Sequence, residues 1–213
     1  MGEDAATQSE IDRRMMGRCI DLSIASGKNG EYPYAAVICQ NGHVVAESTN
    51  RARQDHDVTR HAEVVAISLA QKSLRTVSLD DCEIYVNAEP CALCSYAIRE
   101  SRIRRVVFGL SSPHMGGLSK WNVLSDSDIC TVMPEAFAPP PEILSGYMAN
   151  EAQKALMEWN PLVASAIKRR GVFEAQPTIT STDVQSCAVQ SPGVRRSVWR
   201  FLRRNVFDYF GRR

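Results

Sequence analysis

The sequence has no long hydrophobic run, and no segment reaches eighteen consecutive apolar residues. We therefore expect no membrane span and no membrane partner. The first ten residues, MGEDAATQSE, are acidic and polar, unlike the basic start and apolar core of a signal peptide. These absences predict a cytoplasmic protein.

A disulfide framework is also missing, because the seven cysteines are odd in number and scattered along the chain. In a reducing compartment the default state of a cysteine is the free thiol, and closely spaced cysteines then indicate metal binding or redox chemistry. Hydrophobic residues make up 44% of the 213 residues and charged residues 23%, which is typical of a globular protein with one sizeable core.

The charge is nearly balanced overall, at +1, but it is unevenly distributed. Residues 168–213 contain ten basic and three acidic residues, a balance of +7, whereas residues 1–167 contain 15 and 21, a balance of −6. We predict one folded domain over 1–173 and, over 174–213, a polar linker followed by a basic amphipathic tail. Two interpretations of the tail stay open: a segment that contacts a partner or, against the expectation above, a membrane surface, and a loosely ordered appendage.

Hydrophobic periodicity predicts an α/β fold in which a sheet is covered by helices, with the helix-joined strands parallel. Residues 111–145 read as mostly loop, with a strand near 129–133. The predicted elements are a helix over 10–27, a hairpin turning at Asn41-Gly42, a helix over 61–74, a strand over 82–87, a helix over 91–101, a strand over 104–110 and a helix over 146–159.

Two short motifs carry the chemistry: His-Ala-Glu at 61–63 and Pro-Cys-Ala-Leu-Cys at 90–94. A Cys-x-x-Cys alone also fits a redox pair, but each motif here opens a predicted helix, and two helix starts can hold one ion between them. His61, Cys91 and Cys94 supply one nitrogen and two sulfurs, a donor set that suits tetrahedral zinc. Three protein ligands leave a fourth position for water, as in catalytic zinc sites.

Glu63 lies two residues from the predicted histidine ligand, where a carboxylate can move protons to and from a zinc-activated water. The competing interpretation is a structural or inactive zinc site, which has no need of this glutamate.

His-x-Glu followed by Pro-Cys-x-x-Cys is the zinc-deaminase signature. With the stretches STNRARQDHDVTRHAE and YVNAEPCALCSYAIRESRIRRVVFG, residues 10–160 resemble the cytidine/deoxycytidylate deaminase superfamily, and within it bacterial tRNA adenosine deaminases and related nucleoside and guanine deaminases. The resemblance implies a three-layer α/β/α sandwich with a central mixed sheet, and a homodimer. It also implies that Asn50 contacts the substrate, although a turn residue is the alternative there.

Substrate choice is left open between hypotheses. The loop LSSPHMGGLSKWNVLSDSD places Ser112 and His114 where the tRNA enzymes carry Asp and Lys, and the body is acidic. We therefore expect a small-molecule nucleobase or nucleoside as substrate, with tRNA adenosine-to-inosine deamination as the alternative and a non-enzymatic zinc-stabilised interaction module as a third.

The remaining histidines and cysteines are expected outside the metal site. His43 and His56 are expected at the surface, and His114 in a loop that either borders the substrate or is solvated. Four cysteines are expected in the core: Cys19, Cys39, Cys82 and Cys130.

Overall fold

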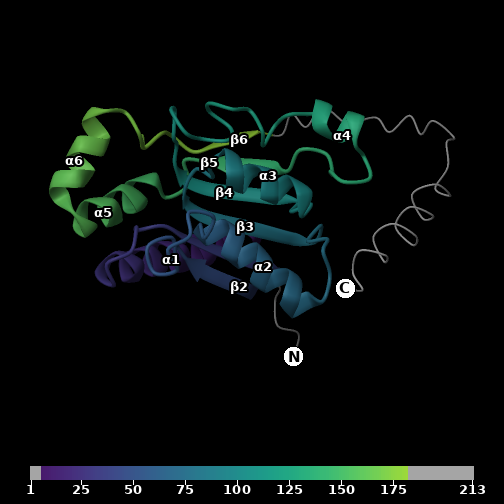
Figure 1. Ribbon diagram of the computed structural model, residues 1–213, viewed down its shortest axis with the longest axis horizontal. Helices are drawn as coiled ribbons and strands as arrows, with labels where there is room; N and C mark the ends of the chain where they lie inside the picture. Colours follow the sequence, from purple (N-terminus) through teal and green to yellow (C-terminus); the bar gives the residue numbers. More distant parts are fainter. Residues whose placement is uncertain (1–5, 182–213) are drawn as a thin grey trace, which may run out of the picture.

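The computed structural model describes residues 6–181, which form a six-stranded mixed sheet in the order β2-β1-β3-β4-β5-β6 (Figure 1). The pairs β3/β4 and β4/β5 are parallel, and the other neighbouring pairs are antiparallel. The predicted hairpin and the predicted parallel, helix-joined pair are confirmed. The strands are β1 (Ala35–Gln40), β2 (His43–Thr49), β3 (Cys82–Ala88), β4 (Arg105–Leu110), β5 (Glu142–Ser145) and β6 (Ile179–Ser181).

Helices cover both faces of the sheet, which confirms the three-layer architecture. In Figure 1, α2 (Ala62–Leu74) and α3 (Ala92–Glu100) lie across the nearer face, and α1 (Gln8–Lys28) lies on the far one. Two separate hydrophobic clusters fill these interfaces, one built with α1 and α5 (Ala149–Trp159) and the other with α2 and α3. None of the described helices is long and apolar enough to cross a membrane.

The central strand β3 is buried along its whole length, and its successive side chains enter opposite clusters. Tyr85 packs with α1, whereas Ile84 and Val86 pack with α2 and α3. Because β3 and β4 are parallel, the connecting helix α3 must begin near the carboxyl end of β3. This topology places the Cys-x-x-Cys motif at the carboxyl end of the central strand β3.

The prediction of a strand near 129–133 is wrong, because Asp128–Val132 forms the short helix α4. The side chain of Thr131 donates to the carbonyl of Ser127, and the helix ends before Pro134. The β-branched residues of this segment resemble a strand, but the place beside β4 is taken by β5. The sequence patterns also missed β5, β6 and α6 (Pro161–Arg169).

The division of the chain at 173/174 stays a prediction, but the first residues of the predicted linker contribute to the fold. Glu174 and Ser111 exchange two backbone hydrogen bonds, each 2.9 Å long, and β6 pairs with β5. The remainder of the linker and the basic tail lie outside the described residues.

Candidate active site and metal centre

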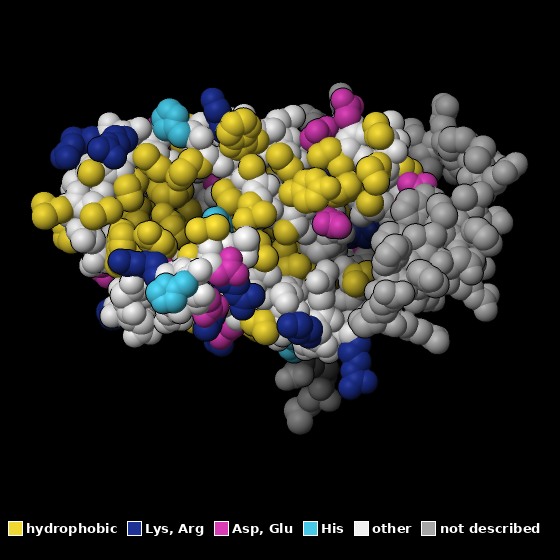
Figure 2. All heavy atoms as spheres, viewed as in Figure 1, with side chains coloured by type: hydrophobic (Ala, Val, Ile, Leu, Met, Phe, Trp, Pro, Cys, Tyr) yellow, Lys and Arg dark blue, Asp and Glu magenta, His cyan; other side chains and the backbone are white. Residues whose placement is uncertain are grey.

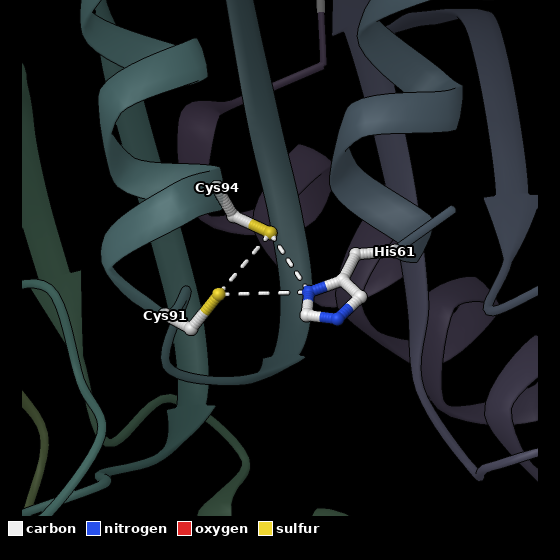
Figure 3. Close-up of side chains that lie close together, drawn as sticks. All are labelled: His61, Cys91 and Cys94. Atoms are coloured by element: carbon white, nitrogen blue, oxygen red, sulfur yellow. Dashed lines mark hydrogen bonds between the residues drawn. The ribbon is translucent and has the colours of Figure 1, made fainter. Parts of the chain in front are cut away.

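The two chemical motifs sit at the first turns of α2 and α3. His61 and Cys91 are the residues that precede these helices, each with extended backbone angles, and neither side chain caps its helix. Their side chains are therefore free to point toward each other, and Cys94 joins them from the first turn of α3 (Figure 3). The sequence-predicted ligands are brought together as expected.

The spacing of the three donor atoms fits one zinc ion. His61 Nδ1 lies 3.5 Å from Cys91 Sγ and 3.4 Å from Cys94 Sγ, and the two sulfurs are 3.6 Å apart. A tetrahedron with zinc–sulfur bonds of about 2.3 Å and a zinc–nitrogen bond of about 2.0–2.1 Å has edges of about 3.5–3.8 Å. The cluster therefore has both the donor chemistry and the dimensions of a zinc site with three protein ligands.

The two thiols differ in their affinity for protons. The hydrogen bond with Cys94, together with the contact with His61, lowers the pKa of Cys91 to about 4 against the effect of burial. The same sulfur–sulfur hydrogen bond, together with burial, raises the pKa of Cys94. Zinc binds cysteine as the thiolate, so metal binding would leave both sulfurs without a proton.

Glu63 lines a cavity of about 330 Å³ that opens beside the metal ligands. Its side chain is buried, and burial raises the pKa of Glu63 to about 6. The aromatic rings of Tyr34 and Phe173 form part of the wall, with centroids 5.9 Å apart. A volume near the lower end of small-molecule sites, with aromatic walls, suits a single planar base.

A second buried carboxylate, Glu89, holds the loop that closes one side of this cavity. It accepts hydrogen bonds from the backbone of Ser112, Leu118 and Ser119 over 2.6–2.9 Å. A Cβ atom on Gly116 would lie 2.1 Å from the Glu89 carboxylate, so only glycine allows the loop to approach this closely. Glu89 was not predicted from the sequence, although a charged residue directly between a buried strand and the metal motif indicates a role at the site.

Asn50 lies at the end of β2, where it is buried and lines the same cavity. Its side-chain amide donates to Glu31 over 3.0 Å. The histidines outside the metal motif behave as expected: His43 and His56 are exposed, and His114 is exposed in its loop and does not line the cavity. Cys19, Cys39, Cys82 and Cys130 are buried in the core.

This fold and donor set define a zinc-dependent deaminase, a hydrolase that acts on C–N bonds. The model of the cytidine and deoxycytidylate deaminase zinc-binding region matches residues 9–110, and the chain belongs to this family. A non-enzymatic zinc module, the third hypothesis from the sequence, is not supported by this membership.

Relatives with named activities include two tRNA-specific adenosine deaminases. The one from Aquifex aeolicus is 40% identical over 100 residues, which span 46% of this chain and 66% of that one, just under two thirds. The one from Agrobacterium fabrum is 34% identical over 114 residues, which span 54% of this chain and 75% of that one.

Solved structures agree with this placement. A chain from a study of A-to-I editing by tRNA:A34 deaminases superposes with a TM-score of 0.60 at 32% identity, over 68% of this chain and 99% of that one. A guanine deaminase from Nitrosomonas europaea superposes with a TM-score of 0.58 at 26% identity, over 69% and 83% of the two chains.

Proposed function

We propose that this protein deaminates adenosine in tRNA and thereby forms inosine. The similarity to two tRNA-specific adenosine deaminases and to a tRNA:A34 deaminase structure supports this reading, which was the alternative in the sequence analysis, over a free base or nucleoside. In the reaction, water adds at C6 of the base, the C6–N6 bond breaks and ammonia leaves.

Glu63 is the residue that we assign to proton transfer. Zinc held by His61, Cys91 and Cys94 would supply a water molecule acidic enough to react at neutral pH. The Glu63 carboxylate would take one proton from the attacking water and deliver it to N1 of the base. It would then take the second proton from the new C6 hydroxyl and deliver it to the departing amino group, so that C6 becomes a carbonyl and ammonia leaves. Burial, which raises the pKa of Glu63 to about 6, suits a group that must both accept and return a proton near neutral pH.

The cavity walls are assigned to binding and orienting the base. Tyr34 and Phe173 offer ring surface for a planar base, and Asn50 offers amide hydrogen-bonding groups at the wall. An adenosine in an RNA loop would have to leave its stack to enter a cavity of this size.

Basic side chains at the end of α6 are the described candidates for contact with the RNA backbone. Lys168, Arg169 and Arg170 are exposed, and none of them has an ion-pair partner within residues 6–181. Figure 2 shows Lys and Arg side chains gathered at the upper left, over the end of α6 and beside a broad hydrophobic surface. Three residues after Arg170, Phe173 lines the cavity, so these charges lie close to its mouth.

The segment that carries these charges is fixed to the cavity wall by hydrogen bonds. Ser112 Oγ donates to the carbonyl of Val172 over 3.1 Å, and Ser111 pairs with Glu174 through the backbone. A phosphate bound at the end of α6 would therefore be held at a defined position relative to the base in the cavity.

A substrate comparison tests the proposal. Zinc-loaded protein is incubated with unmodified tRNA, and inosine is measured by nucleoside mass spectrometry; free adenine, adenosine, guanine and cytosine are assayed in parallel for ammonia release. We expect inosine in tRNA and little ammonia from the small molecules. Turnover of a free base or nucleoside with tRNA left unchanged would contradict the proposal.

The basic end of α6 gives a second prediction. Changing Lys168, Arg169 and Arg170 together to Gln should weaken tRNA binding and reduce its salt dependence. The slope of log K against log salt should fall by about 0.7–0.9 for each phosphate that these side chains neutralise in the wild type. The measurement is a binding titration at several salt concentrations.

The matched control for this variant is Lys72→Gln with Arg75→Gln, which removes exposed charges at the opposite end of α2 from His61. Its binding and its salt dependence should equal those of the wild type. An unchanged slope in the α6 variant would exclude this surface.

A free purine base or nucleoside is the second candidate, and one observation favours it. By the family resemblance, Ser112 and His114 stand where the tRNA enzymes carry Asp and Lys. The guanine deaminase from Nitrosomonas europaea also shares the fold, at 26% identity. The homodimer implied by the family resemblance stays a prediction.

A further inference from the structure

Glu31 is a buried carboxylate that has no part in the chemistry assigned so far. It lies in the connection between α1 and β1 with an exposed fraction of 1%, and it is not among the residues that line the cavity. A buried charge of this kind is retained only where hydrogen bonds compensate for its loss of water.

Four N–H groups supply that compensation. One carboxylate oxygen accepts from Asn50 Nδ2 over 3.0 Å and from the backbone of Tyr32 over 2.9 Å. The other accepts from the backbone of Arg53 and Gln54 over 2.9 and 3.0 Å. Burial by itself would raise the pKa of Glu31, but these hydrogen bonds outweigh it and hold the pKa below its ordinary value. Glu31 is therefore charged at neutral pH.

A charged carboxylate determines how the Asn50 amide is turned. A carboxylate can only accept hydrogen bonds, so Asn50 must present its NH₂ group to Glu31 and direct its carbonyl oxygen elsewhere. Within residues 6–181 no donor is bonded to Asn50 Oδ1, although this side chain lines the cavity. The oxygen is thus available to a hydrogen-bond donor of a bound substrate.

The same carboxylate fixes the turn that follows β2. Its bonds to the backbone of Arg53 and Gln54 hold the start of the segment that supplies Ala52 and Val58 to the cavity wall. The Glu31 side chain therefore joins the loop before β1 to the end of β2 and to this turn. Its partners there lie 19–23 residues after Glu31 in the sequence.

We propose that Glu31 is the positioning residue of the substrate site: it orients the Asn50 carbonyl toward the substrate and anchors the turn at residues 51–54. This inference rests on the proposed role of Asn50 in substrate binding, and it does not depend on whether tRNA or a free base is the substrate. Glu31 acts through Asn50, so its loss affects the binding of substrate more than the proton transfer by Glu63.

A double-mutant cycle on kcat/KM tests the connection. Glu31→Gln, Asn50→Ala and the double variant are compared on whichever substrate the wild type deaminates. We expect each single change to lower kcat/KM by about 10–100-fold, mainly through KM, as for loss of a hydrogen bond to a charged group. Glu31→Gln should cost less in the Asn50→Ala background than in the wild type, because only the anchoring of the turn then remains to be lost. Equal losses from Glu31→Gln with and without Asn50 would overturn the proposal.

Two further measurements separate this role from general destabilisation and from failure of the substrate assignment. Hydrogen exchange without substrate should show at least about 10-fold faster exchange at the amides of Arg53 and Gln54 in Glu31→Gln. Glu31→Asp, which keeps the charge, should recover part of both effects, whereas Glu47→Gln, which removes the surface partner of Arg18, should change neither. Unchanged exchange in Glu31→Gln would refute the anchoring role even if no substrate were found.

Discussion

Replacing Glu63 by Gln should lower the rate of deamination by about 10²–10⁴-fold while the protein keeps its zinc. Glutamine preserves the size of this buried side chain but can neither take a proton from water nor return it to the leaving group. The zinc ligands His61, Cys91 and Cys94 are unchanged, so the metal content should equal that of the wild type. Ammonia release and zinc analysis on the same preparation provide the two measurements.

The control for this variant is Glu100→Gln, which removes an exposed glutamate of α3 outside the cavity lining. Its rate should match that of the wild type. Full activity in the Glu63→Gln protein would show that Glu63 is not the group that transfers protons.

Replacing Cys94 by Ala should remove the zinc and with it both activity and part of the stability. Cys94 is fully buried, and its sulfur contacts both other ligands. Changes in the outer shell of zinc sites already cost about 10–100-fold in affinity, and loss of a direct ligand should cost more. Because zinc binds the folded chain, its loss also lowers the free energy of unfolding. Metal analysis and thermal unfolding with and without a chelator measure the two effects.

The matched control is Cys82→Ala, which removes the same sulfur atom from a fully buried position at the start of β3. It should lose some stability through packing but retain zinc and activity. A chelator should lower the unfolding temperature of the wild type and of Cys82→Ala, and leave that of Cys94→Ala unchanged. Wild-type zinc affinity in Cys94→Ala would show that Cys94 is not a ligand.

The metal centre was predictable from the sequence because its parts are local. His61 and Glu63 belong to one helix start, and Cys91 and Cys94 to another, so the spacing within each motif already fixes which side chains lie together. The predicted helices and strands up to Leu110 also follow from local periodicity, and the structure confirms their order. The homodimer and the substrate are not local properties.

The prediction failed where residues interact over long distances in the chain. The segment at 129–133 has β-branched residues, but β5 already pairs with β4, and that choice is made by packing rather than by propensity. Phe173 gave no signal as a wall residue because it meets Tyr34 across more than half of the chain.

What the sequence by itself determined is the identity of the zinc ligands, the neighbouring glutamate and the class of fold, since each depends on spacing within a few residues. Only the tertiary structure decided how the cavity is closed and how Asn50 is turned. The buried carboxylates Glu31 and Glu89 perform these tasks by accepting hydrogen bonds from segments that lie 19–30 residues away in the sequence. A charge can be held in the interior only by such donors, and they come together only when the chain has folded.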